Sequence, residues 1–315
     1  MDINERVQAR LNLFSCYYKA KYGKPIGKIA LSVGVACPNR QSGGCVYCSA
    51  ASFTPFYLEE GDSVREQLVK GKKDLNTRKF KRYLGYFQQE TTTAAPEKGV
   101  VEDCLLVLSD PECVGLIIST RPDYVEYSFL HELYRRVSMQ ALGDKEILFE
   151  LGLQTSHNRT LQFLNRNHTY EDFVGASEKI KQFPAFQLGV HLILGLPHES
   201  LAEMRATLEL VVGVGVDAVK FHHLQIIRNT ALEKIYSESP FKVYSAYEYM
   251  EILADLITYL PKSTVIHRLW SSSDRDLLVA PDWGGLGAHQ LSGMLLAILE
   301  ENDLRQGKRC LGGEE

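Results

Sequence analysis

Short apolar runs alternate with longer amphipathic stretches along most of this 315-residue chain. Residues that favour β structure gather in six runs, at 28–35, 81–87, 114–119, 146–154, 186–194 and 216–224. Between these runs, apolar residues recur at helical spacing at about 63–75, 99–109, 127–138, 157–182 and 200–213. Strand followed by helix, repeated, predicts an α/β fold with a parallel sheet and right-handed crossovers.

Six such units can form an open doubly wound sheet or part of a (βα) barrel, and periodicity alone does not separate the two. The residues at the strand ends do bear on the choice. Polar or turn-forming residues stand where the predicted strands finish, at Gln88, Ser119, Arg121, Gln154, Gly195 and His222. The carboxyl ends of barrel strands form the functional rim of such folds. We therefore predict a partial, six-stranded parallel barrel with these residues at its rim.

The two ends of the chain have different patterns. Residues 1–25 read as one amphipathic helix that ends before Gly23 and Pro25. From about residue 240 the pattern gives a helix at 246–259, a short strand at 264–267 and a last helix at 288–302. The sequence thus predicts three segments: an amino-terminal helix (1–25), the barrel (26–239) and an extension packed on the barrel (240–315).

Composition narrows the class of protein. With 45% hydrophobic and 23% charged residues, the chain is neither disordered, collagen-like nor a coiled coil. Its apolar runs are too short for a membrane span, and its charged start has no signal-peptide pattern, so we predict a cytoplasmic protein with no membrane partner. The net charge of −4 argues against a protein that coats nucleic acid.

One segment departs from this acidic balance. Seven basic residues lie between positions 70 and 82, opposed within the segment only by Asp74. Such a segment could follow a phosphate backbone, or it could be a solvated helix face.

Three of the seven cysteines, Cys37, Cys45 and Cys48, lie within twelve residues directly after the first predicted strand. The pair Cys45 and Cys48 alone could be a redox dithiol or half of a zinc site. Structural zinc takes four ligands, and the local sequence offers no fourth. Three thiolates suit a [4Fe–4S] cluster with one iron left open. Gly43 and Gly44 would let the loop approach the cluster closely. The other cysteines read as small buried hydrophobes.

At this point the sequence resembles the radical S-adenosylmethionine (radical SAM) proteins. Three cysteines follow the first strand, and an aromatic residue precedes the last of them. Further blocks resemble the YhcC/YtqA-type branch, which is similar to the radical SAM domain of the elongator catalytic subunit. These blocks are Tyr86–Thr91, Ser119–Asp123, Glu150–Thr155, His191–Pro197 and Lys220–Leu224.

The resemblance implies a partial (βα)6 TIM-like barrel, a [4Fe–4S] cluster held by the three cysteines, and S-adenosylmethionine (SAM) chelated to the open iron. One electron, from a donor such as flavodoxin or ferredoxin, would cleave SAM to a 5′-deoxyadenosyl radical. Tyr47 and Gly195 would approach the adenine, while Gln88 and Thr91 would face the amino group of SAM. Arg121, beside Ser119, could pair with the carboxylate of SAM or with Asp123.

Three strand residues complete the expected site. Glu150 and Gln154 lie four apart on one face of a strand, and a charged residue in so apolar a run needs a partner, which favours an inward role. Lys220 and His222 share a face by the same rule, and we expect this pair to contact the substrate.

The sequence also departs from the family pattern. Seven residues separate Cys37 from Cys45, more than in the commonest radical SAM motif, and Arg166-Asn167-His168 stands where relatives often have Arg-Gly-His. The resemblance to the elongator subunit implies tRNA, with an anticodon uridine as the modified group. A protein or small-metabolite substrate is the alternative, and a zinc-stabilised binding module without catalysis is a third hypothesis.

Overall fold

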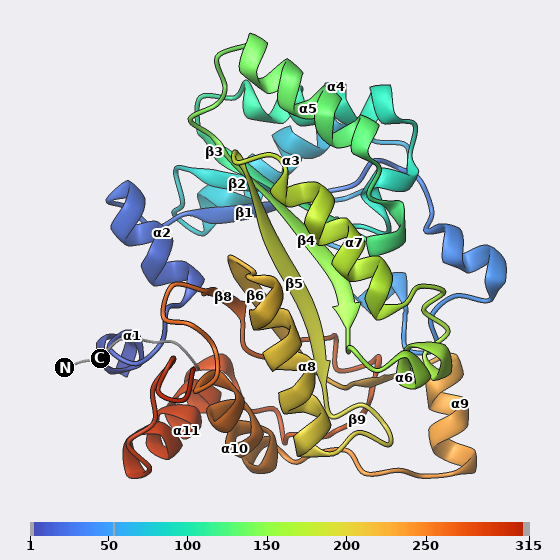
Figure 1. Ribbon diagram of the computed structural model, residues 1–315, viewed down its shortest axis with the longest axis vertical. Coiled ribbons are helices and arrows are strands. Elements are labelled where there is room, and N and C mark those ends of the chain that lie inside the picture. The colour runs from blue at the N-terminus through green and yellow to red at the C-terminus, as the bar shows by residue number, and fades with distance from the viewer. Residues whose placement is uncertain (1–2, 53, 311–315) are drawn as a thin grey trace.

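The structure is a computed structural model that describes residues 3–52 and 54–310 (Figure 1). One curled, parallel sheet dominates it, with the strand order β1-β2-β3-β4-β5-β6-β8. These strands are β1 (Gly27–Leu31), β2 (Tyr83–Phe87), β3 (Cys113–Thr120), β4 (Glu146–Gln154), β5 (Phe186–Leu194), β6 (Ala218–His223) and β8 (Val265–Arg268). Each pairs with its neighbour in parallel, and β1 and β8 remain at the two edges.

Helices cover the convex face of this sheet (Figure 1). They are α3 (Val64–Thr77), α4 (Glu97–Leu108), α5 (Tyr127–Met139), α6 (Asn158–Phe163), α7 (Tyr170–Lys181) and α8 (Leu201–Val214). The predicted α/β partial barrel is confirmed. The sheet has seven strands and not six, because the short strand expected in the last segment, β8, pairs with β6 and extends the sheet.

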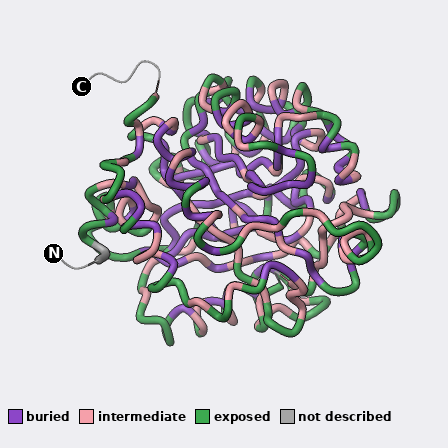
Figure 2. Tube along the Cα trace, turned by 90° about the horizontal axis from the view of Figure 1, so that it is seen from below, coloured by how far each residue is buried: buried purple, intermediate pink, exposed green. Residues whose placement is uncertain are grey.

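The main hydrophobic core lies between the sheet and these helices, and Figure 2 shows the buried residues concentrated in the interior of the molecule. Alternate strand residues face this layer, among them Ile29, Leu116, Phe149 and Val190, all of them inaccessible to solvent. Each such side chain contributes about 1.5–3 kcal/mol by leaving water. The opposite face of every strand is therefore free to line the interior of the half-barrel.

The amino-terminal end of that interior is closed by helix α2 (Phe14–Tyr22). Tyr18 packs with Leu84, Leu148 and other inward residues of the strands. Its hydroxyl donates to Glu146 at 3.1 Å, and Tyr22 donates to the same carboxylate at 2.5 Å. Helix α2 therefore covers the amino-terminal end, while a cavity remains at the carboxyl ends of the strands.

The prediction of one helix over residues 1–25 is wrong. Helix α1 (Ile3–Gln8) and helix α2 are separate, and between them Leu13 forms a parallel bridge with Ile266. The backbone of Asn12 is held on both sides, since its N–H donates to Gln306 and its carbonyl accepts from Ile266, each at 2.8 Å. An extended chain at this point is stabilised by tertiary hydrogen bonds that local periodicity does not reveal.

The prediction of one helix over residues 157–182 is wrong as well. Helices α6 and α7 are separated by residues 164–169, in which Asn165 and Asn167 both have φ of 53°. Asparagine accepts this left-handed conformation more readily than most residues. Thr169 then starts α7 with a capping box to Asp172.

The last segment contains α10 (Ala246–Ile257) and α11 (Ala288–Glu301), which pack together, and α1 lies against α11. Before it come the short strand β7 (Ile226–Ile227) and helix α9 (Ala231–Glu238), and β7 pairs with β9 (Leu278–Ala280). The division at residues 25/26 and 239/240 stays a prediction. In the described ranges 3–52 and 54–310, no helix is both long and apolar enough to cross a membrane.

Candidate active site

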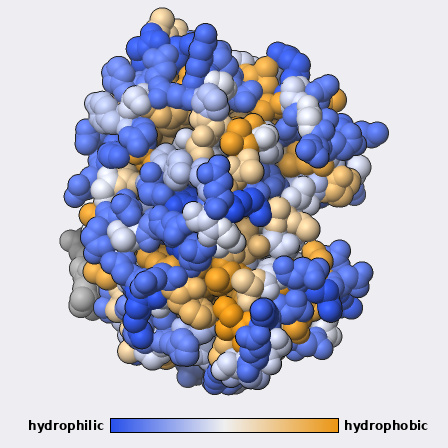
Figure 3. All heavy atoms as spheres, turned by 90° about the vertical axis from the view of Figure 1, so that its right-hand side faces the viewer, coloured by the Kyte–Doolittle hydropathy of each residue, from blue (hydrophilic) through white to orange (hydrophobic). Residues whose placement is uncertain are grey.

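A cavity of about 410 Å³ lies at the carboxyl ends of the strands. This end faces the right-hand side of Figure 1. Figure 3 shows that side as an indented surface with strongly hydrophilic residues at mid-height and apolar residues around them. All the residues expected from the sequence line the cavity except Glu150 and Gly195. Gly195 instead lies against Tyr244, whose ring would be 2.8 Å from an added Cβ. The structure thus gathers most of the predicted site.

The cysteine loop follows β1 and turns through a short 3-10 helix, Pro38–Ser42. Gly43 and Gly44 have φ of 87° and 74°, as expected for a loop that folds back tightly. The three cysteines are free and partly exposed, and all three border the cavity. In the described part of the chain, no three His, Cys, Asp or Glu side chains converge on one position where a single metal ion could be held.

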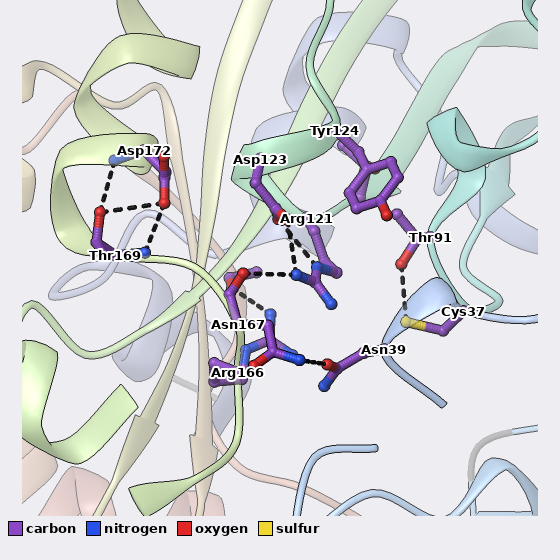
Figure 4. A network of polar contacts seen from close by, with 12 residues as sticks. Cys37, Asn39, Thr91, Arg121, Asp123, Tyr124, Arg166, Asn167, Thr169 and Asp172 are labelled. Atoms are coloured by element: carbon purple, nitrogen blue, oxygen red, sulfur yellow. Dashed lines mark hydrogen bonds and ion pairs between the residues drawn. The ribbon is translucent and has the colours of Figure 1, made fainter. Parts of the chain in front are cut away.

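Hydrogen-bond donors surround two of the thiols. Thr91 Oγ1 donates to Cys37 Sγ at 3.1 Å, a contact visible in Figure 4, and Asn39 Nδ2 approaches Cys45 Sγ at 3.1 Å. Arg166 Nη1 donates to Cys45 Sγ at 3.2 Å. Hydrogen bonds to sulfur adjust the potential of iron–sulfur clusters. The donor set therefore fits a cluster, whose sulfurs accept, and in a cluster each cysteine binds a different iron instead of one shared ion.

Arg166 is a site residue that the sequence reasoning missed. It is buried, and besides Cys45 it donates to the hydroxyl of Tyr47 at 3.2 Å and to the Gly152 carbonyl at 2.6 Å. It was assigned to the interior of a helix, although the asparagines on both sides of it were a signal for a break. The segment 164–169 therefore holds the cysteine loop against strand β4.

The guanidinium of Arg121 has partners on two neighbouring segments. It donates twice to Asp123, at 2.9 and 2.7 Å, and once to the carbonyl of Asn167 at 2.9 Å (Figure 4). The pairing with Asp123 that the sequence suggested is observed, and a contact of Arg121 with the carboxylate of SAM stays a prediction. Gln154 is buried with φ of 75°, and its Oε1 has no hydrogen-bond partner among the described residues. An unpaired buried amide oxygen beside a cavity is suited to a ligand donor.

Glu150 lies deeper in the barrel and is the centre of a buried network. Lys220 Nζ donates to Glu150 Oε1 at 2.9 Å and also to the hydroxyl of Tyr86, which itself donates to Glu150 Oε1 at 2.6 Å. Burial acts to raise the pKa of Glu150, but the nearby Lys220, His191 and Lys28 outweigh it and lower that pKa. Burial lowers the pKa of Lys220 to about 8, against the pull of Glu150. The expected inward placement of Glu150 and Lys220 is thus observed.

His222 lies at the cavity beside His191, with ring centroids 3.9 Å apart. Arg268 Nη1 donates to His222 Nε2 at 3.2 Å, so this nitrogen is an acceptor and the ring is neutral. Burial lowers the pKa of His222, and the neighbouring His191, Arg268 and Lys220 lower it further. His222 therefore links the barrel interior to strand β8, a contact that the sequence did not indicate.

Lys28 stands at the floor of the interior, where its Nζ lies 4.1 Å from the ring centroid of Phe14 and 5.6 Å from that of Tyr86. No carboxylate lies within ion-pair distance of it among the described residues. Burial lowers the pKa of Lys28 to about 7; Glu150 opposes this shift, and Lys220 and Arg268 add to it. This lysine is a destabilising charge below that pH.

We expect Lys28→Met to raise the free energy of unfolding at neutral pH. The folded-state pKa of about 7 lies below the ordinary 10.5, so between these values the unfolded chain holds a proton that the folded chain has released. Raising the pH through this window stabilises the wild type by at most about 1.4 kcal/mol per pH unit. The advantage of the variant should shrink accordingly in urea unfolding at a series of pH values. The exposed Lys81→Met is the control, and parallel profiles for wild type and Lys28→Met would refute this pKa.

The basic segment 70–82 is less positive in the structure than in the sequence. Lys70 pairs with Glu59 and Asp62, Lys72 with Asp110 and Glu112, and Arg78 with Asp74. Most of these acids come from other parts of the chain. Asp74 is the one acid within the segment, and folding adds four carboxylates from residues 59–62 and 110–112.

Comparison with known proteins identifies the family. The model of the Radical SAM superfamily matches residues 31–211, and that of the Radical_SAM C-terminal domain matches residues 216–293. The chain belongs to the radical SAM superfamily, whose cofactors are a [4Fe–4S] cluster and SAM. The hypothesis of a zinc-stabilised binding module is replaced by this assignment.

Within that superfamily the chain is homologous to two bacterial proteins. It is 33% identical over 282 residues to protein YhcC of Escherichia coli (strain K12), covering 88% of this chain and 89% of YhcC. It is 29% identical over 309 residues to protein YtqA of Bacillus subtilis (strain 168), covering 96% and 93%.

Two archaeal matches are more distant. A tRNA uridine(34) acetyltransferase of Methanocaldococcus jannaschii is 24% identical over 200 residues, which are 62% of this chain and 35% of that protein. The solved structure of Methanocaldococcus infernus Elp3 with an amino-terminal deletion matches with a TM-score of 0.63 at 19% identity, over 90% of this chain and 64% of that one. The structural match supports the fold alone.

Proposed function

We propose that this protein is a radical SAM enzyme that modifies tRNA, with a wobble-uridine side chain as the target. The observation that carries the chemistry is the convergence of Cys37, Cys45 and Cys48 on the cavity at the strand ends. The choice of tRNA as the substrate is supported by the partial similarity to an enzyme named for uridine 34 of tRNA. That similarity covers 62% of this chain and 35% of the relative, so the acetyl transfer of the relative is not part of the proposal.

Three thiolates hold the cluster in this proposal, and the bound cofactors supply a 5′-deoxyadenosyl radical after SAM accepts one electron. Other residues of the chain would position SAM beside the cluster. Tyr47 lies against the adenine, and the hydroxyl of Tyr47 is fixed by Arg166. Gln88, Thr91 and Ser119 border the cavity from β2 and β3 and offer polar contacts to the amino-acid part of SAM.

The other wall of the cavity serves the substrate. Lys220 and His222 face the cavity from β6, and Gln154 faces it from β4 with a free amide oxygen. Helix α2 closes the floor with Tyr18 packed on Leu84 and Leu148, and an apolar floor of this kind would limit the access of water to a reactive radical. The electron comes from a reduced carrier protein such as flavodoxin or ferredoxin.

A protein or small-molecule substrate is the second candidate, and the size of the cavity favours the small molecule. A volume of about 410 Å³ falls in the range of small-ligand pockets. Paired charges in segment 70–82 also reduce the positive surface available for RNA. Lys73, Lys79 and Lys81 are exposed and have no ion-pair partner among the described residues, so they remain for phosphate contacts.

Mass spectrometry of tRNA nucleosides tests the substrate. A deletion strain is expected to lose one modified uridine or accumulate its precursor, because no modified product forms without the enzyme. Reduced, reconstituted enzyme with SAM should restore the nucleoside on tRNA from that strain, whereas the Cys48→Ala protein should not. An unchanged nucleoside profile would redirect the search to proteins and metabolites and leave the cofactor assignment in place.

A further inference from the structure

Three of the five cations that line the cavity are paired with carboxylates. The five are Arg40, Arg121, Arg166, Lys220 and Arg268. Arg40 pairs with Glu90 at 2.6 Å, Arg121 with Asp123 at 2.7 Å, and Lys220 with Glu150 at 2.9 Å. Arg166 is held by a cysteine sulfur and a backbone carbonyl. The fifth cation of the cavity is Arg268.

Arg268 ends strand β8 and points its guanidinium at the cavity. In the described ranges no carboxylate lies within ion-pair distance of it, and its one side-chain contact is the donation to His222 Nε2. Arginine keeps its proton in proteins, so this charge cannot be relieved in the way that Lys28 relieves its own. At least two N–H groups of the guanidinium fork are free to bind an acceptor.

The surroundings of Arg268 favour an anion. Lys220 is the Cα partner of Arg268 in the β6–β8 pairing, and Glu150 balances its charge, so the charge of Arg268 is the one left over on this wall. His191 Nε2 is buried and has no partner among the described residues. In a neutral imidazole this nitrogen donates or accepts a hydrogen bond, depending on the tautomer. Ser272, four residues after Arg268, brings an exposed hydroxyl to the same cavity.

We propose that Arg268 is the anchor of an anion-binding subsite that holds an oxyanion of the substrate, a carboxylate or a phosphate, at the β6–β8 side of the cavity. Its planar fork matches two oxygens of such a group. Arg268 ends β8 and the cysteine loop follows β1, so the subsite and the cysteines belong to different strands that border the same cavity. The subsite would select substrates by charge and orient the reacting group against the cofactor. This inference does not rest on tRNA as the substrate.

Calorimetric titration of the reconstituted enzyme, kept anaerobic and saturated with SAM, tests the subsite. The two probes are inorganic phosphate and glutarate, which separate a phosphate site from a carboxylate site. Arg268→Gln should weaken the preferred anion at least tenfold, as expected for a lost charge-assisted contact, and Arg268→Lys should weaken it less. Arg135→Gln, an exposed arginine on α5 paired with Glu132, is the matched control and should bind as the wild type does.

The affinity for SAM, measured on the same variants, should be unchanged, which also shows that they are folded and loaded. Equal anion binding by wild type and Arg268→Gln would overturn the proposal, and so would a loss of SAM affinity with anion binding intact, because Arg268 would then be a SAM ligand. Neither result bears on whether tRNA is modified, so a negative nucleoside profile and a negative titration refute different statements.

Discussion

Replacing any one of Cys37, Cys45 and Cys48 with alanine is expected to remove the iron–sulfur cluster and with it all reductive cleavage of SAM. Each thiolate binds a different iron, so two remaining ligands leave a cluster with two irons open to solvent. Iron content should fall from about four per chain to near zero after anaerobic reconstitution. Iron and sulfide analysis, the visible spectrum and the release of 5′-deoxyadenosine measure the loss.

Two other cysteines are the matched controls. Cys104 on α4 and Cys113 on β3 are fully buried in the layer between the sheet and the helices, away from the cavity. Burial raises the pKa of Cys113 to about 11, so it stays a neutral thiol. Alanine at either position should keep the iron. Complete iron loss in Cys104→Ala or Cys113→Ala, or full iron in Cys45→Ala, would disprove the ligand assignment.

The architecture could be predicted because its signal is local and repeated. Each buried strand is a short apolar run followed by an amphipathic helix, and this order alone implies parallel pairing. The errors fell where tertiary contacts decide the backbone. Leu13 is extended because it bridges to Ile266, some 250 residues away, and β8 joins the sheet by pairing with β6, Ala218 opposite Val265. No window of sequence contains both partners of such a contact.

The site was predictable to the extent that it lies at strand ends. Period-two alternation put Glu150 and Lys220 inside the barrel, and the structure pairs them. Arg166 and Arg268 were not assigned roles, because the first was assigned to a helix interior and the second to an extension outside the barrel. Both reach the cavity through changes of chain direction, the left-handed asparagines in one case and an added strand in the other.

Lys220→Met is expected to lower the free energy of unfolding by about 3–5 kcal/mol, since it leaves Glu150 as a buried charge without its cation. The Met side chain keeps the apolar stem, so the loss reports the charge. Glu150 Oε2 already lacks a partner among the described residues, and only Oε1 would keep the Tyr86 donor. Urea unfolding of the variant measures the change. Lys234→Met, which removes an exposed partner of Glu238 at 3.9 Å, should leave stability nearly unaltered.

The pH dependence of stability gives a second test of this prediction, because it should have opposite directions in the wild type and in Lys220→Met. In the wild type the pKa of Glu150 lies below its ordinary value, so the unfolded chain takes up the proton first and stability is lost as the pH falls through the acid range. Without Lys220, burial dominates and the folded state takes up the proton first. Stability should then be lost as the pH rises above about 4.3. Unchanged acid sensitivity would show that Lys220 does not hold the charge of Glu150.

The double variant Glu150→Gln with Lys220→Met completes the argument, because it removes both charges together. A buried pair replaced by neutral side chains of similar size often costs little, whereas a broken pair costs the desolvation of the charge that remains. The double variant should therefore be more stable than Lys220→Met alone, with a coupling of about 1–3 kcal/mol between the two sites. Additive losses would mean that each side chain acts separately, and that the contact at 2.9 Å contributes little to the stability of the barrel interior.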